Sequence, residues 1–349
     1  MTGSGWASTA LRTSQVDTEP VLDIRGLTVD YGVGDGAVHA ASEVDLVLHR
    51  GEVLGLAGES GSGKSTLAYA VTRLLRPPGV ITGGEAWFHT AEGGEVDLLA
   101  ADAEQLRKLR WSEIAVVFQS AMHALNPVMT VGAQLTDVLE VHRPHLSRHQ
   151  RRERAVELLR MVGITGDRLG SYPHQLSGGM RQRVMIAMAV ACDPKVLIAD
   201  EPTTALDVTI QAGVLEVIRT LCRTLDTAVL LITHDLGVVA EVADRVVVMY
   251  AGRPVEQASV GSLFAEPQHP YTMGLMGALP ANALRSGDRR LAEIPGLVPA
   301  PVDDPDECQF APRCPRATEK CRTERPLLRE LGTDHSVACH HPGREVTSD

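Results

Sequence analysis

Residues 58–66 read GESGSGKST and match the phosphate-loop pattern G-x-x-x-x-G-K-[ST]. A short apolar run at residues 53–57 precedes them, and a helix-compatible stretch at residues 64–75 follows. This strand–loop–helix order lets backbone N–H groups wrap a polyphosphate at a helix N-terminus. Lys64 would place its charge on the β and γ phosphates, and the Ser65 hydroxyl would bind Mg²⁺. The predicted phosphate-binding residues are Gly58, Glu59, Ser60, Gly61, Ser62, Gly63, Lys64, Ser65 and Thr66.

Length and charge limit the class of protein. The chain has 349 residues, enough for one large α/β domain with an appendage or for two modest domains. Its formal net charge of −11 argues against a nucleic-acid binder, whose affinity rests on Lys and Arg. The longest apolar run, residues 184–192, is half of what a bilayer span needs, and the polar first twenty residues predict no secretory signal. We expect a cytosolic protein whose membrane role requires a partner.

The pattern of residues along the chain divides it into three parts. Residues 1–20 are polar and predict a disordered tail. Residues 21–265 carry short apolar runs typical of parallel strands covered on both faces, interrupted at about 120–180 by Arg- and Glu-rich helical stretches such as 151–162. Residues 266–349 are rich in Pro and carry four of the six cysteines, which predicts a loop-rich extension.

Five segments after the phosphate loop place polar or small residues where predicted strands end or helices begin. In chain order they are Gln119, the turn Ser177-Gly178-Gly179, the pair Asp200-Glu201, Asp207 and His234. Four apolar residues lead into Asp200 and Glu201, so a solvated strand end explains the pair poorly. Asp200 can hold Mg²⁺ through water, and Glu201 can orient or deprotonate an attacking water. Gln119 can reach both the metal and that water.

In motif content, order and spacing, residues 21–265 resemble the ATP-binding subunits of ABC transporters. The resemblance implies an α/β fold with a P-loop core, an antiparallel β subdomain and a helical subdomain, to which the extension with four cysteines is added. It also implies that His234 hydrogen-bonds the γ-phosphate and that Gln119 relays ATP status to the helical subdomain. Tyr31 follows the first strand pattern, where the family places an aromatic that stacks on adenine, although a lone aromatic there is often only core.

The turn Ser177-Gly178-Gly179 would form a second anion site at a helix N-terminus. In the family that this chain resembles, such a turn meets the γ-phosphate bound to another subunit, and Asp207 would lie at the same seam. Two ATP molecules are then enclosed between two ATPase chains, and we expect the partner to be a similar but different subunit. Met180 departs from the Gln that most of the family carries, but Met followed by Arg-Gln-Arg resembles the oligopeptide branch.

Other segments also resemble the oligopeptide/dipeptide and nickel importer branch. They are Ala124-Leu125-Asn126-Pro127, Ser171-Tyr172-Pro173-His174-Gln175, His269-Pro270-Tyr271-Thr272 and Ile294-Pro295-Gly296. The resemblance implies an ATPase at the cytoplasmic face of the membrane with two permease subunits and, indirectly, an extracytoplasmic solute-binding protein. It leaves peptide, oligosaccharide and nickel open as the solute.

Four cysteines lie within the last forty-two residues, at Cys308, Cys314, Cys321 and Cys339. In a reducing cytosol this clustering favours a metal centre over disulfides, although no C-x2-C pair is present. The oligopeptide branch carries a similar motif, Cys-x-Phe-x-x-Arg-Cys, which in some members binds a [4Fe–4S] cluster. Six Arg or Lys against two Glu in residues 308–329 suit such an anionic cluster. Structural zinc and unliganded thiols stay open, with His335, His340 and His341 as substitute ligands.

Three functions compete for this sequence. The first is the ATP-hydrolysing subunit of an importer for di- or oligopeptides or similar solutes, with ATP and Mg²⁺ as cofactors and no nucleic acid as partner. The second is a soluble ABC ATPase acting on nucleic acid or ribosomes, which the single ATPase domain and the acidic charge disfavour. The third is a non-hydrolysing regulatory subunit, which the intact Lys64, Glu201 and His234 disfavour.

Overall fold

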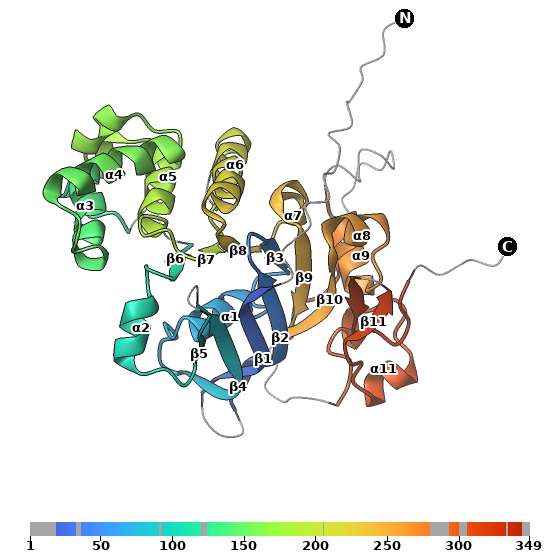
Figure 1. The fold of residues 1–349 in the computed structure, drawn as a ribbon. Helices are drawn as coiled ribbons and strands as arrows, with labels where there is room; N and C mark the ends of the chain where they lie inside the picture. Colours follow the sequence, from blue (N-terminus) through green and yellow to red (C-terminus); the bar gives the residue numbers. More distant parts are fainter. Residues whose placement is uncertain are drawn as a thin grey trace, which may run out of the picture.

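The computed structural model describes residues 19–32, 36–90, 93–119, 124–204, 206–279, 293–299, 306–332 and 334–343. Two β-sheets form its framework (Figure 1). An antiparallel sheet has the order β2-β1-β4-β5 and consists of β1 (Pro20–Tyr31), β2 (Val38–His49), β4 (Gly79–His89) and β5 (Glu95–Asp97).

The larger sheet has the order β11-β12-β10-β9-β3-β8-β7-β6. Its parallel part consists of β3 (Val53–Ala57), β6 (Ile114–Val117), β7 (Val196–Asp200), β8 (Ala228–Thr233) and β9 (Arg245–Tyr250). Every residue of β3, β7 and β8 is buried, as the continuous apolar runs predict for strands covered on both faces. The sheet continues antiparallel through β10 (Arg253–Ser259), β12 (His335–Val337) and β11 (Arg329–Gly332).

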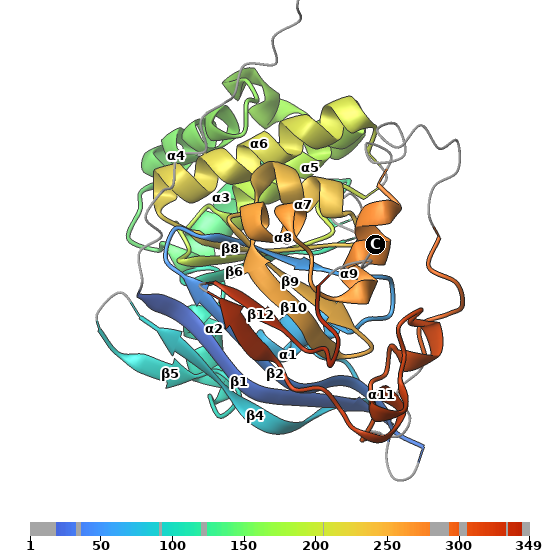
Figure 2. The same cartoon turned by 90° about the vertical axis from the view of Figure 1, so that its right-hand side faces the viewer.

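Helices cover both faces of the parallel strands. Helix α1 (Lys64–Val71) contacts β1, β2 and β7, so it lies between the two sheets, and one hydrophobic core surrounds it. A second core lies on the other face, beneath α5 (Gly178–Ala189) and α6 (Val208–Leu225) (Figure 2). The sequence predicted that α1 would continue to residue 75. It ends at Val71 because Arg73 has a left-handed backbone conformation, with φ of 54°.

A helical subdomain lies between β6 and β7, and its last helix ends at Ala189. It consists of α3 (Val131–His142), α4 (Arg148–Met161), the 3₁₀ segments η2 (Gly166–Gly170) and η3 (Pro173–Gln175), and α5. Helix α4 begins at a capping box in which Ser147 and Gln150 bond each other's backbone N–H groups. The other helices are α2 (Ala103–Leu109), α7 (Leu236–Val242), α8 (Val260–Ala265), α9 (Pro270–Gly277) and α11 (Glu319–Thr323).

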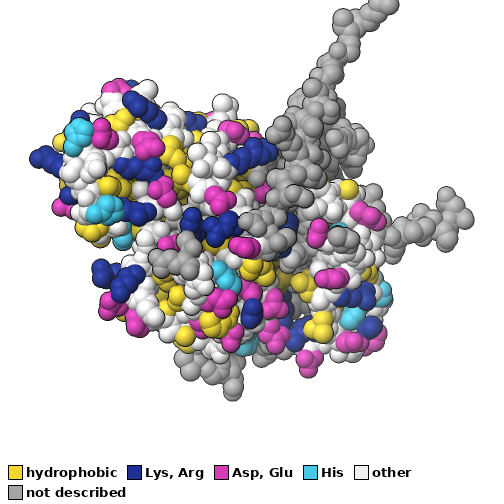
Figure 3. Space-filling view, viewed as in Figure 1, with side chains coloured by type: hydrophobic (Ala, Val, Ile, Leu, Met, Phe, Trp, Pro, Cys, Tyr) yellow, Lys and Arg dark blue, Asp and Glu magenta, His cyan; other side chains and the backbone are white. Residues whose placement is uncertain are grey.

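The C-terminal extension joins the large sheet of the ATPase part. Strand β12 pairs with β10, and the turn η4 (Ala311–Arg313) packs Phe310 into a third core with residues of β9 and α9. The extension and the helical subdomain lie at opposite ends of the molecule in Figure 1. On the face seen in Figure 3, acidic and basic side chains are interspersed, so the negative charge is not gathered in one patch there.

Candidate functional site

The phosphate loop joins β3 to α1, as its sequence context predicts. Gly63 has a φ of 93°, and a Cβ there would lie 2.0 Å from the Ala40 carbonyl oxygen, so only glycine fits. The Lys64 ammonium lies inside the loop. It donates hydrogen bonds to the carbonyl oxygens of Gly58 and Glu59, both at 2.8 Å, and to Ser62 Oγ at 3.1 Å. The loop therefore already has the curled shape that a polyphosphate requires.

Burial lowers the pKa of Lys64 to about 8, although three nearby carboxylates, Glu201, Asp200 and Glu59, act against that shift. Lys64 therefore stays mostly protonated at neutral pH, although its charged form is less favoured than in water. A bound polyphosphate would favour the charged form, because its oxygens are anionic. Phosphate binding is therefore expected to raise the pKa of Lys64.

The Ser65 hydroxyl and the Asp200 carboxylate face each other across the junction of α1 and β7. Ser65 Oγ donates to Asp200 Oδ1 at 2.9 Å, and the Tyr69 hydroxyl donates to Asp200 Oδ2 at 3.2 Å. Burial raises the pKa of Asp200, while the hydrogen bonds from Ser65 and Tyr69 lower it, and the net direction is upward. A hydroxyl and a carboxylate at this spacing form the oxygen donor set that Mg²⁺ prefers, so these residues fit the predicted metal.

Glu201 collects three side-chain hydrogen bonds on its carboxylate. Its Oε2 accepts from Gln119 Nε2 at 2.6 Å and from Thr204 Oγ1 at 2.7 Å, and its Oε1 lies 3.0 Å from His234 Nδ1. Burial raises the pKa of Glu201, but the bonds from Thr204, His234 and Gln119 outweigh it and the net shift is downward. The carboxylate is therefore ionised at neutral pH, as a base for water must be.

The sheet order explains why residues far apart in the sequence meet here. Strands β3, β8, β7 and β6 are neighbours, and the predicted residues follow their carboxyl ends. In open α/β sheets the carboxyl ends of parallel strands form the ligand-binding edge. One edge of the sheet thus carries the phosphate loop together with the predicted strand-end residues, which are Gln119, Asp200, Glu201 and His234.

Ser177, Gly178 and Gly179 lie elsewhere, at the start of α5. Ser177 is exposed and caps the helix by accepting from the Met180 N–H at 3.3 Å, and Asp207 caps α6 in the same way. A Cβ on Gly179 would lie 2.3 Å from Ile210 Cγ2, so glycine is required for the contact of α5 with α6. Among the described residues no hydrogen bond joins Ser177 or Asp207 to the phosphate loop.

Tyr31 ends β1 and is half-buried against the core between the two sheets. It lies near Tyr69 of α1, whose hydroxyl pKa is raised to about 12 by burial, by Asp200 and, to a smaller extent, by Tyr31. The adenine role of Tyr31 stays a prediction.

Two site residues escaped the sequence prediction. Tyr69 holds the Asp200 carboxylate and Thr204 holds that of Glu201. Tyr69 follows Ser65 by four residues, so both lie on the same face of α1, and helical periodicity could have revealed it. Thr204 sits in the turn after Glu201, where no regular periodicity applies.

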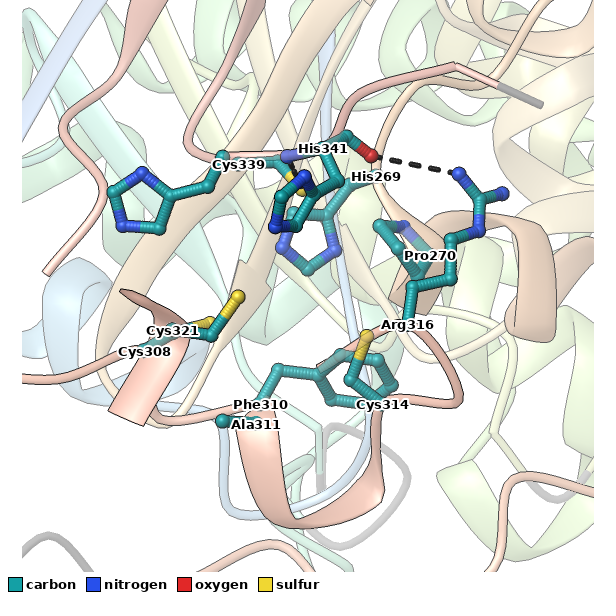
Figure 4. Close-up of a pocket in the computed structure, with 11 residues that line it drawn as sticks. His269, Pro270, Cys308, Phe310, Ala311, Cys314, Arg316, Cys321, Cys339 and His341 are labelled. Carbon is teal, nitrogen blue, oxygen red and sulfur yellow. Dashed lines mark hydrogen bonds between the residues drawn. The ribbon is translucent and has the colours of Figure 1, made fainter. Parts of the chain in front are cut away.

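The four C-terminal cysteines line one pocket. Its wall also includes His269, Pro270, Phe310, Ala311, Arg316, His340 and His341. Figure 4 shows the side chains of Cys308, Cys314, Cys321 and Cys339 around this pocket. Burial, and to a smaller extent the charges of the other three thiols, raise the pKa of Cys308 to about 11. The shared location is what their clustering in the sequence predicted.

Backbone N–H groups point at three of these sulfurs. Cys339 Sγ accepts a hydrogen bond from the His341 N–H at 3.3 Å. In the same way, the backbone of Phe310 bonds Cys308 and the backbone of Arg316 bonds Cys314. Hydrogen bonds of this kind stabilise thiolates that bind metal centres. Of the histidines considered as substitute ligands, His335 instead bonds Glu256 at 2.8 Å. Within the described residues, no group of three or more His, Cys, Asp or Glu is arranged to hold a single metal ion.

Comparisons with known proteins identify the family. Residues 41–204 match the family model of the ABC transporter, and residues 255–321 match that of the oligopeptide/dipeptide transporter, C-terminal region. The oligopeptide transport ATP-binding protein AppD of Bacillus subtilis is 45% identical over 321 residues, covering 91% of this chain and 96% of the relative. The dipeptide transport ATP-binding protein DppD of Escherichia coli is 45% identical over 324 residues, covering 92% and 97%.

Solved structures agree with the predicted fold. The dimeric ATP-binding cassette MJ0796, in a post-hydrolysis state with ADP and phosphate, is 29% identical with a TM-score of 0.59. The match covers 68% of this chain and 98% of that one, so the ABC ATPase fold is confirmed. An importer ATPase therefore explains these matches, and a soluble ABC ATPase does not. Because relatives at 45% identity span nearly the whole chain, this chain belongs to the ATP-binding proteins of the ABC transporter family, in the oligopeptide/dipeptide branch.

Proposed function

We propose that this chain hydrolyses ATP to drive the uptake of di- or oligopeptides. The observation that carries the catalytic part is the ionised Glu201, held by Gln119, Thr204 and His234 beside the phosphate loop. AppD and DppD are named as oligopeptide and dipeptide transport proteins, and these names support a peptide as the solute. The matching C-terminal region supports the same branch.

Each residue of the site has a role in this proposal. Lys64 binds the β and γ phosphates, and Ser65 and Asp200 would hold Mg²⁺, which when bound neutralises phosphate charge. Glu201 accepts a proton from the attacking water, and Gln119 orients that water. His234, whose Nδ1 lies 3.0 Å from Glu201 Oε1, would hydrogen-bond the γ-phosphate. Tyr31 stacks on the adenine ring.

The working unit contains two ATPase chains, this one and a similar but different subunit. The exposed turn at Ser177 supports this arrangement, because among the described residues no hydrogen bond joins it to the phosphate loop of its own chain. The cassette MJ0796, whose solved structure is dimeric, supports it too. In the assembly, Ser177, Gly178, Gly179 and Asp207 of this chain contact the nucleotide that the other chain binds.

Two permease subunits complete the transporter, with the ATPase chains at the cytoplasmic face of the membrane and a solute-binding protein outside. In the part of the chain that the structure describes, no helix has the length and apolar character to cross a bilayer. The contact with the permeases forms on the helical subdomain, which follows Gln119 in the sequence and stands clear of the C-terminal extension (Figure 1).

Peptide uptake by the assembled transporter tests the proposed solute. With both ATPase chains, both permeases and the binding protein in vesicles, adding peptide is expected to raise ATP turnover and peptide accumulation together. Nickel and an oligosaccharide serve as matched solutes in the same preparation and should leave turnover at its basal rate. Stimulation by either of them, with none by peptide, would assign the chain to another solute within the branch.

We further propose that Cys308, Cys314, Cys321 and Cys339 hold a [4Fe–4S] cluster. The four thiols around one pocket and the N–H groups aimed at three of them support it. The excess of Arg and Lys over Glu in residues 308–329 suits an anionic cluster, and it favours the cluster over zinc in this proposal. When bound, the cluster would cross-link a segment with few apolar residues.

Metal analysis distinguishes these occupants. Protein purified without oxygen is expected to be brown, to absorb broadly near ~400 nm and to contain about four irons per chain. Cys308→Ser should remove most of the iron, whereas Cys222→Ser, which alters a buried cysteine outside the pocket, should leave it unchanged. Stoichiometric zinc without iron in that preparation would replace the cluster by a zinc site.

A further inference from the structure

The C-terminal extension touches the phosphate loop through one arginine. Arg313 lies in the turn between Cys308 and Cys314, and its guanidinium forms a bidentate ion pair with Glu59 of the loop. The two N···O distances are 2.7 and 3.1 Å. Because Arg313 is only 8% exposed, water screens its ion pair with Glu59 only in part. Both residues stand in motifs of the sequence, but neither their types nor their spacing connects them.

The remaining contacts of Arg313 fix its guanidinium in one place. The Nε donates to the carbonyl oxygen of Pro295 at 2.9 Å, and Nη2 donates to that of Ile294 at 3.1 Å. The group also lies over the ring of Tyr250, 5.7 Å from the ring centre. A planar fork held from several directions can position its carboxylate partner, which a flexible lysine could not do as well.

A second contact holds the backbone of Glu59. Its N–H donates to the Tyr271 hydroxyl at 2.8 Å. Tyr271 packs against Tyr250 and Phe310, with ring centres 4.7 and 5.4 Å away, and Phe310 belongs to the same cysteine turn as Arg313. The amide of Glu59 is therefore committed to this contact, and the extension holds both the backbone and the side chain of one loop residue.

The charge of Glu59 matters to the nucleotide site. The Glu59 carbonyl accepts a hydrogen bond from the Lys64 ammonium at 2.8 Å, and the Glu59 carboxylate is one of the three charges that act on that ammonium. An unpaired carboxylate at this position would repel a polyphosphate and compete for Lys64. Arg313 neutralises that carboxylate while it keeps the loop in place.

We propose that Arg313 is a positioning residue for ATP binding, through which the C-terminal extension sets the affinity of the phosphate loop. Arg313 does not touch the nucleotide in this proposal. It acts through Glu59, by holding the carboxylate away from the phosphates and by balancing its charge. The proposal concerns the protein part of the extension and stands whether iron, zinc or nothing occupies the cysteine pocket.

The full-length chain tests this through the binding of a fluorescent ATP analogue. Arg313→Gln is expected to raise the Kd by about tenfold, because removal of one partner leaves the other charge uncompensated. Adding Glu59→Gln to that variant should return the Kd to within about threefold of the unmodified chain, since the repelling charge is then gone. The defect of Arg313→Gln should also shrink between about 50 and 500 mM salt, because screening weakens the repulsion.

Lys320→Gln is the matched control, because it breaks an ion pair with Glu324 that is solvent-exposed and lies in the same extension. Its Kd should not change. The proposal is overturned if Arg313→Gln binds as the unmodified chain does, or if the double variant is as weak as the single one, since a merely structural role predicts no rescue. If Arg313→Gln does not fold, Arg313→Lys replaces it. Lysine keeps the charge and loses the fork, so an intermediate Kd supports the proposal and an unchanged Kd overturns it.

Discussion

Replacing Glu201 by Gln is expected to slow ATP hydrolysis by about 10²–10⁴-fold, the usual contribution of a general base. The local geometry should survive the change. The Oε2 of Glu201 accepts from Gln119 and Thr204, so the amide oxygen of Gln can take its place, and the amide nitrogen then faces His234 Nδ1. The variant keeps these contacts but has no carboxylate to accept the proton of water.

Phosphate release and sedimentation with ATP measure this outcome. Glu201→Gln should bind ATP with little change, because Lys64 and Ser65 are untouched, and should accumulate as an ATP-bound dimer with its partner subunit. Glu153→Gln makes the same chemical change at an exposed position of α4, next to His149, and should hydrolyse ATP normally. Turnover by Glu201→Gln within about threefold of the control would remove Glu201 from the role of base.

The catalytic edge could be predicted from the sequence because the phosphate loop and each of the other polar segments follow a short apolar run. The sequence cannot state the strand order, but parallel strands of one sheet bring their carboxyl ends to the same side whichever order they take. Lys64, Asp200 and Glu201 therefore meet in the structure as expected. The prediction is confirmed at the level of the fold, and the roles of the individual residues stay proposals.

Contacts across long stretches of sequence were beyond such reasoning. Arg313 and Glu59 are 254 positions apart, and neither residue type nor spacing links them. The same holds for the pairing of β12 with β10, which makes the cysteine extension part of the ATPase sheet. Both contacts depend on how the chain returns after residue 265, and that path is set by tertiary packing of Tyr250, Tyr271 and Phe310.

A negative charge at the start of α5 should prevent two ATPase chains from closing on ATP. Ser177→Asp keeps the helix cap, since Asp is as good an N-cap as Ser, but it places a carboxylate where the proposal puts the γ-phosphate of the other chain. Ser177→Asn is the matched control, because it also caps the helix and carries no charge.

We expect Ser177→Asp to lower ATP turnover of the assembled transporter by at least about 10²-fold, the effect of losing one donor to a reacting phosphate or oxyanion, and Ser177→Asn to lower it far less. In sedimentation with ATP, the Asp variant should stay monomeric even when it also carries Glu201→Gln. ATP affinity of the isolated chain should be the same for all of these variants, because no hydrogen bond joins Ser177 to its own phosphate loop in the described structure. If Ser177→Asp weakened ATP binding by the isolated chain as much as it lowered turnover, the turn would act within its own subunit, and the sandwich of two chains would be wrong.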